Sequence, residues 1–143
     1  MFLTRLWDPQ QGEPVWELYA IAEGGECQVT ASLDQWLNTP ELEAYAAGLV
    51  ALLEQISRHE RGPALFHGNQ TLCHEAVTGE AIYRFRKGDL RLYWFYGDDR
   101  KVVIFPYCEI KRTEKVAASV KRRLIAARDE YREAHRKAKL KIV

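Results

Sequence analysis

The chain has 143 residues, of which 47% are apolar and 29% are charged, and its formal net charge at pH 7 is +1. These values are typical of one globular domain, so we expect residues 1–143 to fold as a single domain. The longest run without a charged or strongly polar residue covers residues 44–53, about half of the roughly 20 residues that a transmembrane helix needs. This excludes a membrane-spanning helix and predicts no membrane partner.

Three cysteines, Cys27, Cys73 and Cys108, lie far apart in the sequence. Their odd number and wide spacing do not suit a disulfide framework and fit a reducing compartment. The first residues reach Asp8 and Pro9 before a stretch of signal-peptide length develops, so we expect a cytoplasmic protein. No Cys-x-x-Cys or His-x(3–5)-His pair is present, and the sequence therefore predicts neither a metal site nor another cofactor.

The net charge conceals a division between the two halves of the chain. Residues 1–60 contain two basic and ten acidic side chains, a balance of −8, whereas residues 61–143 have a balance of +9. A basic region is where a nucleic acid or another polyanion is expected to bind. The division favours polyanion binding by the C-terminal half, and solvated helix faces are the alternative interpretation.

The N-terminal half is predicted to contain one strand and two helices. Val15–Ala22 is rich in strand-forming residues and ends at a turn signal. A short helix is expected over Ser32–Asn38, after which Thr39-Pro40 supplies a cap and a proline for the start of a longer helix. Apolar residues recur every three or four positions in that helix until Gly62. Residues 62–79 are predicted to form a loop.

Three closely spaced strands predict an antiparallel meander, and a long helix follows them. The strands are expected over Glu80–Arg86, Leu90–Tyr96 and Lys101–Tyr107. Short turns at Lys87-Gly88 and Asp98-Asp99 suit tight hairpins. Thr113 can cap the last helix, which is expected to run from about Glu114 to beyond Arg136 with an apolar stripe.

The expected turns determine which side chains share a face of the meander. One face collects apolar side chains, namely Ala81, Tyr83, Phe85, Leu90, Leu92, Trp94, Val103, Phe105 and Tyr107. The other face places Arg84 directly opposite Arg91. Like charges in this position are mildly destabilising unless an anion lies between them. A phosphate would supply that anion, because arginine donates two parallel hydrogen bonds to it. The alternative is that both side chains splay apart into water.

The order of these elements resembles that of the RelE/HigB toxin superfamily, especially its phage-type (Gp49-like) branch. The similarity in motifs covers about residues 80–128: Leu90-Arg91-Leu92-Tyr93-Trp94, then Lys101-Val102-Val103-Ile104-Phe105, then Ile110-Lys111-Arg112-Thr113. The resemblance implies an α+β, RelE-like fold. Its antiparallel sheet would consist of the N-terminal strand and the three-stranded meander, with two N-terminal helices and a long C-terminal helix.

The resemblance also implies a function. Members of this family are typically toxins of type II toxin-antitoxin systems that cleave mRNA without a metal, often on the ribosome. The chain is therefore predicted to be a toxin-like, metal-independent endoribonuclease, or mRNA interferase, that uses the 2′-OH of the RNA as its nucleophile. It would need no cofactor. Its expected partners are ribosome-bound mRNA and a cognate antitoxin protein.

Matching the motifs residue by residue assigns the candidate site. Arg91 matches the arginine of the family's central strand, Arg84 matches a basic position on the preceding strand, and Arg112 matches the basic residue before the last helix. With Lys111, these residues form the predicted catalytic set. The predicted RNA-binding residues are Arg86, Tyr93, Arg122 and Arg123.

Some positions depart from the family pattern. Ile82 stands where the family has a second lysine, Ala118 falls near the helix tyrosine of RelE itself, and Pro106-Tyr107-Cys108-Glu109 differs from the phage-type motif. Cleavage needs an acceptor for the 2′-OH proton. The sequence leaves four alternatives open for that role: Lys111, Glu109, Tyr93 and His74.

Two other functions compete with the toxin hypothesis. The first is a non-catalytic RelE-like module that binds RNA, the ribosome or a protein through the same basic face. The second is a phage accessory protein whose acidic helical half docks a host partner. An adjacent antitoxin reading frame would favour the toxin.

Overall fold

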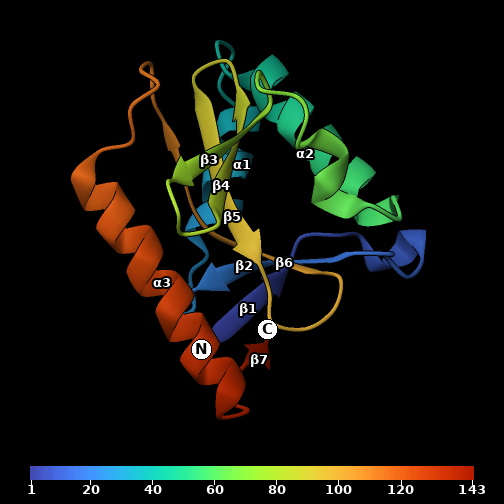
Figure 1. Cartoon of the computed structure of the whole chain (residues 1–143). Coiled ribbons are helices and arrows are strands. Elements are labelled where there is room, and N and C mark those ends of the chain that lie inside the picture. Colours follow the sequence, from blue (N-terminus) through green and yellow to red (C-terminus); the bar gives the residue numbers. More distant parts are fainter.

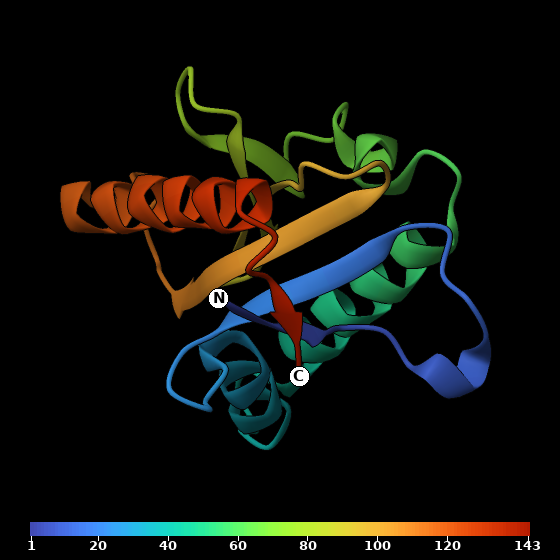
Figure 2. The same cartoon turned by 90° about the horizontal axis from the view of Figure 1, so that it is seen from below.

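The computed structural model describes all 143 residues and shows one sheet with helices on both faces. The strands are β1 (Phe2–Arg5), β2 (Glu17–Ala22), β3 (Cys73–Val77), β4 (Ile82–Lys87), β5 (Leu90–Tyr96), β6 (Val102–Ile110) and β7 (Lys141–Ile142). The helices are α1 (Gln28–Leu37), α2 (Glu43–Arg58) and α3 (Ala118–Arg136), with short 3-10 helices at Pro9–Gln11 and Gly62–Phe66. Figure 2 shows α3 on one side of the sheet and α1 and α2 on the other.

The sheet is mixed, which corrects the prediction of an antiparallel, RelE-like sheet. Its seven strands lie in the order β3-β4-β5-β6-β2-β1-β7. Strand β2 runs parallel to β6, with Leu18 beside Val103, and β7 runs parallel to β1. The remaining neighbours are antiparallel. The protein is therefore an α+β structure with three helices and a seven-stranded mixed sheet.

The path of the chain explains the parallel pair. After β2, the chain crosses one face of the sheet through α1 and α2 and enters the sheet again at its far edge as β3 (Figure 1). The antiparallel strands β3 to β6 then step back toward β2, and β6 arrives beside β2 in the same direction. Patterns within single strands do not show this return. They also missed the short strands β1, β3 and β7, of which β3 lies in the predicted loop 62–79.

Two apolar layers separate the sheet from its helices. The layer under α1 and α2 contains Phe85, Leu92 and Trp94, which confirms the prediction that these residues share a buried face. The layer under α3 contains Ile82 and Phe95 from the sheet, together with α3 residues. Neighbouring residues of β4 and β5 therefore point into different layers.

The β4–β5 hairpin is shifted by two residues from the predicted register. Lys87 pairs with Leu90, so the turn residues are Gly88 and Asp89 rather than Lys87 and Gly88. Gly88 has a φ of +54°, and a Cβ atom there would lie 2.5 Å from ring atoms of Tyr45. Only glycine suits this first turn position. Because side chains alternate with a period of two, the shift leaves every residue on its predicted face.

The connection from β5 to β6 also differs from the prediction. The loop covers residues 97–101 instead of the pair Asp98-Asp99, and a bulge in β6 places Phe105 and Pro106 opposite the single residue Trp94. Proline has no N–H to donate to a neighbouring strand, and a bulge accommodates it. The bulge turns Tyr107 toward the α3 side, which corrects its assignment to the face of Phe105.

The helices begin at other residues than predicted. Helix α1 begins at Gln28 rather than at Ser32, and α2 begins at Glu43, after a turn that follows Thr39. Helix α3 begins at Ala118, because Glu114 instead contacts arginines of the sheet. None of the helices combines the length and the apolar character needed to span a membrane.

Candidate anion site on an arginine-rich sheet face

Charged and polar side chains gather on the α3 side of strands β3 to β6, near the β4–β5 turn. Cross-strand pairing places them in two rows: Arg86, Arg91 and Glu109 in one, and His74, Arg84, Tyr93 and Tyr107 in the other. Directly paired side chains lie on the same face, about 5 Å apart. This corrects the prediction that Arg84 opposes Arg91, since Arg91 faces Arg86. The three guanidinium groups nevertheless lie on one surface, which we call the arginine cluster.

One carboxylate binds two members of the arginine cluster. Glu114, in the segment between β6 and α3, accepts a hydrogen bond through Oε2 from Nη2 of Arg84 at 2.8 Å, and its Oε1 pairs with Nη1 of Arg86. The main-chain carbonyl of Glu114 also accepts a hydrogen bond from Nη1 of Arg84 at 2.8 Å. Arg84 is only 4% exposed beneath this residue, and its Nε has no partner. Burial lowers the pKa of Arg84.

Arg91 lies deeper than the other two arginines, with 1% of its surface exposed. Its Nη1 donates to the carbonyls of Gly88 at 2.6 Å and Leu90 at 3.1 Å, and its buried Nε has no partner. Burial, and then the charges of Arg86 and Arg84, lower the pKa of Arg91. Burying a cation without a counter-ion is costly. Arg91 therefore carries a buried positive charge that has hydrogen bonds to its own hairpin but no ion pair.

The second carboxylate of the face is engaged by a tyrosine. The Tyr93 hydroxyl donates to Oε2 of Glu109 at 2.5 Å, and Tyr93 is fully buried. Burial, followed by the hydrogen bond to Glu109, raises the pKa of Tyr93 well above its usual value. Tyr93 is thus a neutral donor that holds Glu109, and it is poorly suited to accept a proton.

His74 is the titratable group at the open edge of the arginine cluster. It is half-buried on β3 beside Arg84. Burial, and then the charges of Arg84 and Arg86, lower its pKa from the usual 6.5, so its imidazole is neutral at pH 7. With Arg86 and Glu114 it lines a hollow of about 550 Å³. Of the four proton acceptors suggested by the sequence, His74 is the one that lines this hollow.

The remaining predicted site residues lie around this face. Lys111 directly follows β6 and is half-buried, and its N–H donates to the carbonyl of Asp89 at 2.7 Å. Arg112 is 85% exposed and pairs with Asp89 at 3.5 Å. Both residues therefore belong to the segment that carries Glu114. Neither forms a hydrogen bond with the arginine cluster.

The two arginines predicted on the last helix differ from each other. Arg122 is exposed on α3, without an ion pair. Arg123 stacks over the ring of Tyr107, with its Cζ 4.4 Å from the ring centroid. Tyr107 in turn lies parallel to Tyr93, at 6.2 Å between ring centroids. Arg123 therefore extends the basic surface from the arginine cluster toward α3.

Sequence reasoning missed Glu114 as a site residue. Its position after Thr113 favoured the interpretation of a helix start, which explains an acidic residue without reference to the sheet. The available signal was indirect. Glu114 is the one acidic residue among the three basic ones of residues 111–115, and the three arginines of residues 84–91 require a counter-charge. Sequence spacing gave no measure of its contact with Arg84, which lies 30 residues away.

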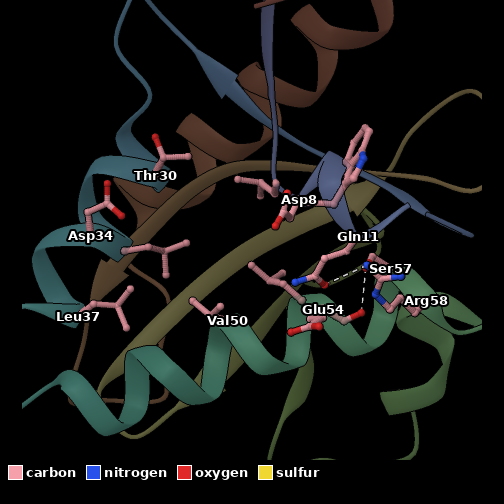
Figure 3. A pocket seen from close by; sticks show the side chains of 13 residues that line it. Asp8, Gln11, Thr30, Asp34, Leu37, Val50, Glu54, Ser57 and Arg58 are labelled. Carbon is pink, nitrogen blue, oxygen red and sulfur yellow. Dashed lines mark hydrogen bonds between the residues drawn. The ribbon is translucent and has the colours of Figure 1, made fainter. Parts of the chain in front are cut away.

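A second hollow of about 360 Å³ lies on the opposite side of the sheet and has the opposite charge. Asp8, Asp34 and Glu54 surround an apolar floor between α1, α2 and the segment after β1 (Figure 3). Arg58 is the one basic residue in its wall, and its Nη2 donates to Gln11 at 3.1 Å. This hollow contains none of the predicted site residues.

The chain matches no model of a known protein family, and no curated protein matches its sequence. The resemblance to the RelE/HigB superfamily therefore stays a prediction from short motifs, and the sheet that it implied is wrong. No group of three or more His, Cys, Asp or Glu side chains is placed to hold a metal ion. The chemistry open to this site is that of its arginines, its histidine and its two engaged carboxylates.

Proposed function

We propose that this protein binds RNA at the arginine cluster and cleaves it there, with its own side chains supplying the charge and the proton acceptor. The observation that carries the proposal is the position of His74, which lies beside Arg84 and lines a hollow with Arg86 and Glu114, where Glu114 pairs with both arginines. Guanidinium groups bind phosphate oxygens in pairs. A neutral imidazole next to a bound phosphodiester can accept a proton from the neighbouring 2′-OH.

The reaction follows from these positions. His74 takes the 2′-OH proton while the 2′ oxygen attacks phosphorus, and the bond to the 5′ oxygen breaks. The products are a 2′,3′-cyclic phosphate and a 5′ hydroxyl, whose proton comes from water at the open edge of the hollow. Arg86 at the surface, with the charge of Arg84 beneath it, stabilises the additional negative charge of the transition state. Arg91 is too deeply buried to touch RNA, so it acts as a positioning residue beneath them.

The broader proposal is that the cleaved RNA is ribosome-bound mRNA and that a cognate antitoxin restrains the enzyme. It is supported by the motif similarity of residues 80–128, and no feature of the sheet adds to it. Inducible expression with growth measurement and mapping of mRNA 5′ ends tests it, with Arg91→Ala as the inactive comparison. Stable expression with normal growth and unchanged 5′ ends would remove the toxin role.

A specific observation favours a second candidate, a non-catalytic module that binds RNA. Arg84 and Arg91 are almost inaccessible, and Arg91 donates to carbonyls of its own hairpin, as a structural arginine does. In such a module Arg86 and Arg123 would contact phosphates from the surface. Binding would then depend on salt, and no RNA would be cleaved.

Single-turnover cleavage of a short RNA separates the two candidates. We expect His74→Ala to lower the rate about 100-fold or more, because a positioned proton acceptor contributes that much. Arg86→Lys should lower the rate about tenfold or more with little change in affinity, since lysine keeps the charge but loses the paired donors. His59→Ala and Arg100→Lys are matched controls away from the site. RNA binding without cleavage by the wild type would establish the binding module instead.

A further inference from the structure

The anion site is already occupied by an anion of the chain itself. Glu114 offers both carboxylate oxygens and its main-chain carbonyl to Arg84 and Arg86. Two guanidinium groups that share one carboxylate could share a phosphate in the same arrangement. A phosphate on this site would compete directly with Glu114.

Glu114 also controls access to Arg84. Its own side chain is 58% exposed, whereas that of Arg84 beneath it is 4% exposed. A ligand can therefore reach Glu114 from solvent but reaches Arg84 only after the carboxylate has moved. The open edge at Arg86 and His74 provides the first contact for a phosphate.

The segment that carries Glu114 is held at both ends and is free of backbone bonding between them. The N–H of Lys111 donates to Asp89, and Val116 is buried in the layer under α3. The N–H groups of residues 112–116 form no backbone hydrogen bond, and Arg112 has only the exposed pair with Asp89. Figure 1 shows this segment as the connection from β6 to α3. Few interactions besides those of Glu114 oppose its displacement.

We propose that Glu114 is an internal competitor that occupies the arginine cluster until a phosphate-bearing ligand displaces it. The inference rests on the proposed function, because it assumes that phosphate binds the arginine cluster. Residues 112–115 swing outward as one phosphate takes the place of one carboxylate on Arg84 and Arg86. The apparent dissociation constant of the ligand is then its intrinsic value divided by the fraction of molecules in which Glu114 is displaced.

The test is a comparison of phosphate binding by the wild type, Glu114→Gln and Glu114→Ala, with inorganic pyrophosphate as the probe and calorimetry as the readout. If Glu114 leaves the site in about one molecule in ten, both variants bind pyrophosphate about tenfold more tightly than the wild type. Glu130→Gln removes the same charge from an exposed position on α3 and should change affinity less than twofold. Thermal melting of each variant verifies that it is folded.

A structural role for Glu114 predicts the reverse result. If the carboxylate only orients Arg84 and Arg86 for their ligand, both variants bind pyrophosphate more weakly than the wild type, and the proposal is overturned. Equal affinity of all the proteins, or no binding by any of them, overturns it as well. These results are independent of the RNA cleavage measurement, so a wild type that cleaves RNA while Glu114→Gln binds no better contradicts the competitor and leaves the proposed function intact.

Limited trypsin digestion supplies a second readout. The segment contains Lys111, Arg112 and Lys115, all potential cleavage points. Saturating pyrophosphate should speed cleavage there in the wild type, because displacement exposes the segment, and it should have little additional effect on Glu114→Ala, in which the segment is already released. Protection of these sites by pyrophosphate in the wild type would contradict displacement.

Discussion

Alternate residues of β4 and β5 meet opposite surroundings. Phe85 and Leu92 point toward α1 and α2 and are fully buried among apolar side chains, whereas Arg84 and Arg91 point the other way and are 4% and 1% exposed. The two faces share a backbone and nearly the same burial. They differ in what is buried, since the first face is apolar apart from the unpartnered indole N–H of Trp94, and the second buries two guanidinium groups whose Nε atoms have no partner. One face therefore stabilises the fold by burying apolar surface, whereas the other buries two positive charges, of which only Arg84 has an ion pair.

The largest effect should follow a change on the packed face. Leu92→Ala should lower the free energy of unfolding by about 2 to 5 kcal/mol, through lost burial and the cavity that remains. Urea denaturation followed by tryptophan fluorescence measures this. Val50→Ala, at an exposed position of α2, should change stability by less than about 0.5 kcal/mol. Equal losses for the two variants would refute the packing role of this face.

A smaller effect of opposite sign should follow on the arginine face. Arg91→Met removes a buried cation that has no counter-ion and keeps much of its volume, so the free energy of unfolding should stay level or rise by about 1 kcal/mol. Affinity for RNA should fall, because the electrostatic attraction of the arginine cluster weakens. Urea denaturation measures the free energy of unfolding, and a salt titration of RNA binding measures the affinity. A loss of several kcal/mol would show that Arg91 is needed to hold the hairpin.

The smallest effect concerns pH. Because the pKa of His74 is lowered in the folded protein, the unfolded chain binds more protons as the pH falls below about 6.5. His74 should therefore cost no stability above that pH, and the free energy of unfolding should decline as the pH falls through the folded-state pKa of His74. His74→Asn should flatten this decline by a fraction of a kcal/mol, which denaturation curves between pH 5 and 8 can resolve. His59→Asn is the control, and an unchanged slope in His74→Asn would contradict the lowered pKa.

The two faces of the hairpin were predictable from the sequence because they depend only on the alternation of side chains along each strand. Alternation placed Phe85 with Leu92, and Arg84 with Arg91, on their correct sides even though the turn was assigned one residue too early. The cross-strand partners were not predictable in this way, because they depend on the turn position that Gly88 and Tyr45 determine together. The prediction for Tyr107 was wrong for a related reason. The bulge at Pro106 reverses which face each following side chain of β6 points to.

The rest of the candidate site depends on contacts between distant segments. His74 lies on a strand hidden within a predicted loop, and Glu114 was expected in a helix. Each gains its place from one partner, Arg84, which lies 10 and 30 residues away along the chain. Local propensity carries no information about such pairs. Basic residues could be identified as candidates, but the sequence could not show which of them would be buried, which would be paired and which would remain open to a ligand.

The parallel pairing of β2 with β6 has a consequence for the order of folding. Glu17 pairs with Val102, 85 residues later, whereas every strand pair of the arginine face lies within residues 73–110. Contacts that close long loops form late, and local hairpins form early. During synthesis β2 emerges before β6, so one of its edges stays unpaired until β6 has left the ribosome. Its buried residues Leu18 and Ala20 lack their partners Val103 and Phe105 for that time. The interval before β6 arrives is when this chain is most exposed to misassociation.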